Sequence, residues 1–121
     1  MYLSFIDVFV YNPFISVNML TLTYIALSDC ITEYIKLSNK LRSASTPADH
    51  ANYKKMIEAN HKKALDIVRS NNITPPALAC EIVSARQDRL DAVIRRDVKD
   101  IHACELTITF FRCLINSKRS S

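Results

Sequence analysis

The chain has 121 residues, a formal net charge of +4, an apolar fraction of 49% and no glycine. This length corresponds to one domain, and a charged fraction of 23% is ordinary for a folded protein. Tight β-hairpins and phosphate-binding loops favour glycine, because glycine has no Cβ to clash at positive φ. The absence of glycine from the sequence therefore argues against β-rich folds, P-loops and dinucleotide-binding fingerprints, and it predicts an all-α protein.

Residues 1–18 form a nearly uncharged apolar arm, and all 16 Lys and Arg residues lie from Lys36 onward. The arm lacks the positively charged start and the small-residue cleavage site of a secretory signal peptide. We expect it to lie in a groove or to pair with another copy, unless Met19 is the true start of the folded chain. Its candidate partner-binding residues are the larger apolar side chains Phe5, Val8, Phe9, Tyr11 and Phe14.

A membrane-anchored protein is one alternative, because residues 8–28 contain no charge. That run is long enough to cross a bilayer, and the positive-inside rule would then place the basic remainder on the cytoplasmic side. Asn12, Pro13 and Asn18 interrupt the run and disfavour a spanning helix. A membrane is therefore the less favoured partner.

Two helices are predicted after the arm. Apolar residues recur at three- and four-residue spacings over residues 20–41, which is the pattern of a helix with one buried face. Thr46, followed by proline, is typical of a helix start. This second helix should run to about Ser70, with Asn71 and Asn72 replacing glycine at its left-handed end. The stripe of the first helix comprises Leu20, Tyr24, Leu27, Ile31, Tyr34 and Leu41.

A third amphipathic segment begins at Thr74, whose hydroxyl precedes two prolines, and extends to Ile115. At this length we expect a break near residues 99–102. Apolar residues on one face predict a seam that packs against other helices. The predicted organisation is an arm (1–18), a bundle of three to four helices (19–116) and a basic flexible tail (117–121). The seam residues are Ala79, Val83, Leu90, Val93, Val98, Ile101, Cys104, Ile108, Phe111 and Ile115.

No catalytic, cofactor-binding or metal-binding group is predicted, so we expect a protein that is not an enzyme and carries no cofactor. His50, His61 and His102 have no motif around them, and each is interpreted as a surface histidine. His102 and Cys104 are two residues apart and face away from each other on a helix, which disfavours a shared metal ion. The four cysteines stand singly and are predicted to be reduced and buried.

DNA binding through a degenerate helix-turn-helix at residues 75–99 is the leading alternative function. In this interpretation residues 74–84 form the first helix and the turn, and the residues that follow open a recognition helix. Asp88 and Asp91 dilute the positive field, and one uninterrupted helix with solvated arginines explains the same sequence. The candidate base-contacting residues are Arg86, Gln87 and Arg89, and the candidate phosphate-contacting residues are Arg95, Arg96 and Lys99.

The favoured function is protein–protein binding. The arm and two seam-bearing helices carry more apolar surface than a bundle of this size buries, which is typical of self-association or of a partner groove. We therefore predict a small cytoplasmic regulatory or inhibitory protein that binds a protein partner through apolar helical faces and forms a homo-oligomer. The alternative in which the stripes pack on each other inside a monomer stays open.

Overall fold

The computed structural model describes residues 16–120, with the side chains of residues 25–118. Four helices occupy this range: α2 (Ser16–Arg42), α3 (Pro47–Ser70), α4 (Pro75–Arg95) and α5 (Val98–Ser120). The described residues contain no strand, so the prediction of a small all-α bundle is confirmed. The candidate partner-binding residues of the arm, from Phe5 to Phe14, lie outside the described residues.

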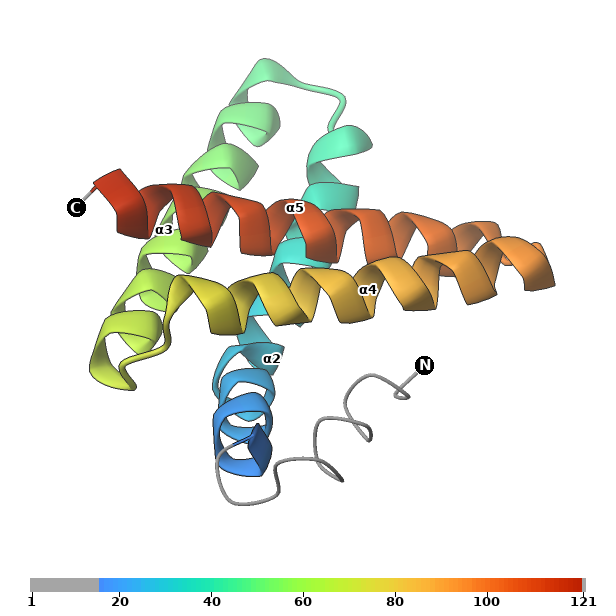
Figure 1. The fold of residues 1–121 in the computed structure, drawn as a ribbon. Coiled ribbons are helices and arrows are strands. Elements are labelled where there is room, and N and C mark those ends of the chain that lie inside the picture. Colours follow the sequence, from blue (N-terminus) through green and yellow to red (C-terminus); the bar gives the residue numbers. More distant parts are fainter. Residues whose placement is uncertain (1–15, 121) are drawn as a thin grey trace.

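The helices form two antiparallel pairs that cross each other (Figure 1). The α4–α5 pair and the α2–α3 pair each share extensive contacts, and α5 also packs against α2 and α3. The turn that joins α4 to α5 extends beyond the α2–α3 pair (Figure 1). One end of the α4–α5 hairpin is therefore anchored in the bundle, whereas the other end projects from it.

The two predicted helix starts are confirmed. The Thr46 hydroxyl oxygen accepts a hydrogen bond from the Asp49 N–H at 3.1 Å, and the first residue of α3 is a proline. Thr74 does the same for the Ala77 N–H at 3.3 Å at the start of α4. In both places a threonine hydroxyl accepts from a free backbone N–H group. Proline occupies the first helical position, where no backbone N–H donor is needed.

Two helix ends reach the left-handed conformation without glycine. Asn72 after α3 has φ 53° and Arg96 after α4 has φ 58°. Behind Arg96, the Asp97 N–H donates to the Ala92 carbonyl at 3.0 Å, which closes the turn in the manner of a Schellman motif. The Asp97 carboxylate then accepts from the Asp100 N–H at 3.1 Å and caps α5. The break therefore lies at residues 96–97, and its predicted position at residues 99–102 was wrong.

The core joins all four helices in one cluster. The C-terminal part of the predicted seam is confirmed, because Ile108 and Phe111 are buried and Ile115 packs against the core cluster. On α2, the buried stripe residues are Leu27 and Ile31. The buried members of the cluster are Leu27, Cys30, Ile31, Ala64, Val68, Ile73, Ala77, Leu78, Ile82, Ala85, Ile108, Phe110, Phe111 and Leu114.

Polar contacts tie the end of α5 to α3 and to the segment after it. The Lys118 ammonium donates to the Ile73 carbonyl at 2.7 Å, and His61 Nε2 lies 3.1 Å from the Ser117 hydroxyl. A further polar contact joins α3 to α2, where the buried Asn60 side-chain amide donates to the Cys30 carbonyl at 2.9 Å. Helix α5 extends to Ser120, past the expected beginning of a tail at residue 117.

No helix among residues 16–120 has the length and apolarity needed to cross a bilayer. The alternative span at residues 8–28 begins outside the described residues.

Candidate functional site

Helix α4 buries a face on which alanines alternate with Leu78 and Ile82. Leu78, Ala85 and Ala92 follow one another at intervals of seven residues, and all three are buried. Residues seven apart lie on nearly the same side of a helix. Small side chains on that side allow the α4 backbone to approach its neighbours closely.

The opposite face of α4 is apolar and exposed. Val83, Leu90 and Ile94 retain 50%, 55% and 79% of their surface exposed. We call the face formed by residues Cys80, Val83, Gln87, Leu90 and Ile94 the outer stripe. All five of its members are exposed.

The α4 half of the predicted seam was therefore wrong. The residues assigned to it are exposed, because the alanine-rich face packs against the bundle instead. Val98, at the start of α5, is exposed as well. The exposed seam residues are Ala79, Val83, Leu90, Val93 and Val98.

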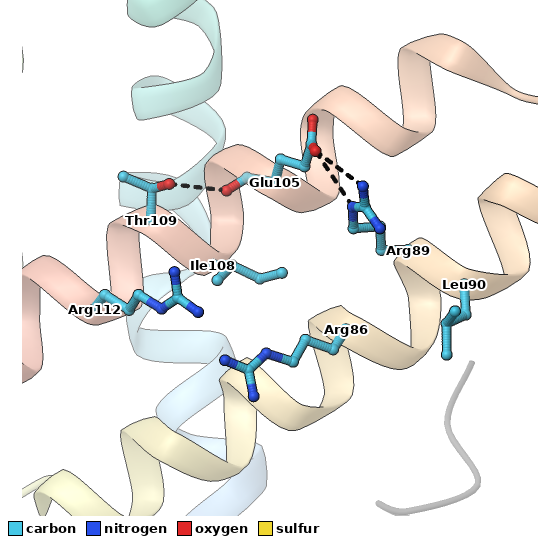
Figure 2. Close-up of a pocket in the computed structure, with 7 residues that line it drawn as sticks. All are labelled: Arg86, Arg89, Leu90, Glu105, Ile108, Thr109 and Arg112. Carbon is cyan, nitrogen blue, oxygen red and sulfur yellow. Dashed lines mark hydrogen bonds and ion pairs between the residues drawn. The ribbon is translucent and has the colours of Figure 1, made fainter.

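A hollow of about 490 Å³ lies beside the outer stripe, between α4 and α5. Ile108 forms an apolar part of its wall, and Leu90 belongs to both the hollow and the outer stripe. Figure 2 shows arginines on both sides of this hollow. We call it the arginine cleft, and its lining residues are Arg86, Arg89, Leu90, Glu105, Ile108, Thr109 and Arg112.

The arginines of the cleft differ in their pairing. Arg89 donates through Nε and Nη2 to one carboxylate oxygen of Glu105, at 3.3 and 3.1 Å. Arg86 from α4 and Arg112 from α5 extend into the hollow (Figure 2). Among the described side chains neither Arg86 nor Arg112 has an ion-pair partner. The cleft therefore holds a positive charge that its own carboxylate does not balance.

The predicted helix-turn-helix was wrong, because α4 continues without a turn from Pro75 to Arg95. The six candidate nucleic-acid residues consequently do not share one surface. Arg86 and Arg89 line the cleft, and Gln87 lies on the outer stripe. Sequence reasoning missed Arg112, because only the folding of α5 beside α4 brings it near Arg86.

The other three candidates lie at the projecting end of the hairpin. Arg95 contacts the carboxylates of Asp97 at 3.6 Å and Asp100 at 2.7 Å. The hydrogen bond to Asp100 is the main reason that the pKa of Arg95 is raised above its ordinary value. Arg96 adopts the left-handed turn conformation, and Lys99 is exposed on the first turn of α5. Arg95 is therefore already neutralised by its neighbours.

Burial shifts the pKa values of two titratable groups on α3 and α4. Burial raises the pKa of Glu81 on α4 to about 7, and no hydrogen bond or ion pair to this carboxyl occurs within residues 25–118. Burial lowers the pKa of His61, which is half-buried rather than on an exposed face. Within the described part of the chain, no three His, Cys, Asp or Glu side chains could hold a metal ion.

The cysteines divide into two classes. All four thiols are free, and Cys30 is buried while Cys104 is half-buried. Cys80 and Cys113 are exposed, so the expectation of four buried cysteines was wrong for these two. Cys80 is exposed because it lies on the outer stripe.

No protein-family model, curated protein or solved structure matches this chain. The candidate site therefore consists of what the hairpin itself presents: an apolar outer stripe and, beside it, the arginine cleft.

Proposed function

We propose that this chain is a small, non-enzymatic protein-binding module that regulates or inhibits its partner by covering it with the outer stripe of α4. The observation that supports the proposal is the exposure of Val83, Leu90 and Ile94 on one side of a helix whose other side is buried in the core. Large exposed apolar side chains gathered on one side of a packed helix are typical of an interaction surface.

Burial of the outer stripe by a partner is energetically favourable. Full burial of one Val, Leu or Ile side chain contributes about 1.5–3 kcal/mol. Three such side chains side by side can therefore offset a substantial part of the cost of association. Because α4 is already held in place by the bundle, little further ordering is needed when a partner binds.

The same proposal places the protein in the cytoplasm. Four free thiols, two of them exposed, suit a reducing environment such as the cytoplasm. The arginines beside the stripe would favour a partner whose apolar surface is flanked by carboxylates.

Site-specific photo-crosslinking in the cells that naturally make the protein tests this function. One variant carries p-benzoylphenylalanine in place of Ile94, and the matched control carries it in place of Ile25, an exposed isoleucine on α2. We expect protein adducts from position 94 at least fivefold above those from position 25. Equal yields at the two positions, or no adduct from position 94, would contradict the proposal.

A second candidate function, nucleic-acid binding, rests on Arg86 and Arg112, which extend into one cleft without an ion-pair partner among the described residues. Arginine is well suited to bidentate contacts with phosphate. If this function is correct, duplex DNA binds with an affinity that falls steeply with salt, and Arg86→Ala with Arg112→Ala weakens binding tenfold or more. Lys54→Ala with Lys55→Ala, at two exposed positions on α3, is the control. Equal losses in both double variants would indicate net charge rather than a site.

A further inference from the structure

The outer stripe follows a strict heptad spacing. Residues 80, 83, 87, 90 and 94 are separated alternately by three and four residues, which is the a/d pattern of a coiled coil. With residues 80, 87 and 94 at position a, the buried residues Leu78, Ala85 and Ala92 all fall at position f, directly opposite. Helix α4 therefore has one side committed to the bundle and the other arranged as a seam for a second helix.

The C-terminal half of the seam matches a parallel two-stranded coiled coil. Ile94 stands at position a and Leu90 at position d, and β-branched residues at a with leucine at d favour two parallel strands. Gln87 is the one amide in the seam, at position a. A single polar residue at such a position fixes the register, because pairing it with its own equivalent satisfies its hydrogen bonds.

Charges beside the seam are complementary in the same arrangement. Arg86 occupies position g and Asp91 the following position e. In a parallel, in-register pair each Arg86 faces Asp91 of the other copy, which gives two ion pairs by symmetry. An antiparallel pair centred on Gln87 would instead bring the two Arg86 side chains together.

We propose that the outer stripe is covered by a second copy of this chain, with the two α4 helices parallel and Gln87 opposite Gln87. The inference rests on the proposed function, since it names the occupant of the same surface. Leu90 and Ile94 of each copy form the most apolar layers of the interface. The outer stripe supplies two heptads of α4 for the pair, from residue 80 to residue 94.

In a parallel, in-register pair each residue of one α4 helix lies opposite the same residue of the other. Cys80 therefore faces Cys80, and residue 94 faces residue 94. In the antiparallel pair centred on Gln87, Cys80 faces Ile94 instead. The two Cys80 residues are then about 21 Å apart along the axis, at a rise of 1.5 Å per residue.

Disulfide trapping separates these arrangements. The experiment uses two variants of the chain. Both carry Cys104→Ser and Cys113→Ser, and the Cys30 thiol of each is buried and out of reach. The first keeps Cys80, and the second has Cys80→Ser with Ile94→Cys. Diamide removes two protons and two electrons from a pair of facing thiols and joins them as a disulfide. We expect each chain alone to form a covalent dimer, and a mixture to yield no disulfide between the two kinds of chain.

A charge exchange supplies an independent test. Arg86→Glu places two carboxylates opposite each other across the interface, and we expect the dimer dissociation constant to rise about tenfold. Adding Asp91→Arg to the same chain restores opposite charges and should return the constant to within about threefold of the original. Thermal unfolding followed by circular dichroism shows whether each variant keeps its helices.

The outcomes distinguish this inference from the proposed function. Disulfides only in the mixture, or no rescue by Asp91→Arg in a folded chain, would overturn the parallel pair. A purified full chain that stays monomeric while position 94 still forms adducts with a different protein would also overturn it, and the protein-binding function would stand. A monomeric chain without such adducts would overturn both.

Discussion

Helices α4 and α5 carry stripes of the same spacing, yet the outer stripe of α4 is exposed and the α5 stripe is buried or half-buried. The α5 stripe comprises Ile101, Cys104, Ile108, Phe111 and Ile115. On α5, Phe111 and Ile108 are buried in the core. On α4, Val83 and Leu90 retain about half of their surface exposed, at 50% and 55%. Both helices lie in one hairpin, so the difference arises from the residues between the stripe positions rather than from the position of the hairpin.

The size of the neighbouring side chains accounts for the difference. The residues beside the α5 stripe include Phe110, whose ring lies 5.7 Å from that of Phe111 and 5.5 Å from that of Tyr34. These rings fill the space between the two helix pairs. On α4 the side opposite the outer stripe packs through Ala85 and Ala92 together with Leu78 and Ile82, and the side chains of the outer stripe remain outside. Spacing thus identifies a face, whereas packing decides which face is covered.

The largest expected effect on the free energy of unfolding comes from truncating a large buried side chain of the α5 stripe. Phe111→Ala should lower the free energy of unfolding by about 3–5 kcal/mol, because it leaves a cavity that the neighbouring helices only partly close. Urea denaturation of dilute protein measures it. The matched change in the exposed stripe, Leu90→Ala, should alter the value by less than about 0.5 kcal/mol. Similar losses in both variants would show that the stripes are equivalent, against the comparison made above.

A smaller effect is expected from adding bulk to the close-packed side of α4. Ala92 has no exposed surface, and Ala92→Leu should cost about 1–3 kcal/mol of unfolding free energy because the helix must move outward. Ala79 is exposed on the same helix, so Ala79→Leu is the control and should be nearly neutral. A tolerated Ala92→Leu would mean that α4 does not pack through its small residues.

The smallest effect concerns the carboxyl of Glu81. Its pKa is raised from 4.5 to about 7 by burial, so the protonated form favours folding. The resulting stability is fully present below pH 4.5 and is lost as the pH rises through 7. Glu81→Gln should therefore raise the unfolding free energy at pH 8 by about 1–2 kcal/mol, after allowance for screening by solvent, and leave it nearly unchanged at pH 4.

Thermal unfolding of the original chain and of the Glu81→Gln variant, measured from pH 4 to 8, gives the difference in their unfolding free energies. The contribution of His61, whose pKa is lowered by burial, is common to the two proteins and cancels in the difference. A difference between the proteins that does not change over this pH range would contradict the raised pKa of the half-buried Glu81 carboxyl.

The local features of the fold could be predicted from the sequence because they depend on neighbouring residues. A hydroxyl before proline at Thr46 and Thr74, and asparagine at the left-handed end of α3, each leave a short-range signal. The end of α4 at Arg96 was missed because arginine is an unusual residue for that conformation. Asp97, as a capping residue three positions before Asp100, was the signal that could have located it.

The candidate site could be predicted only in part. Hydrophobic periodicity identified Val83 and Leu90 as members of one face, but not that the face is exposed. The arginine cleft depends on Arg86 and Arg112, which are far apart in the sequence and meet only when α5 folds beside α4. The spacing within α4 does not show which of its faces the other helices of the same chain cover.

Sedimentation equilibrium of the full chain tests the central claim most directly, namely that two copies of the chain associate through the outer stripe of α4. We predict a mass of twice the 13.8 kDa chain at micromolar concentration, and a return to the mass of one chain in the Ile94→Glu variant with its helix content unchanged. A mass of one chain at every concentration up to the millimolar range, with or without Ile94→Glu, would contradict self-association through this stripe.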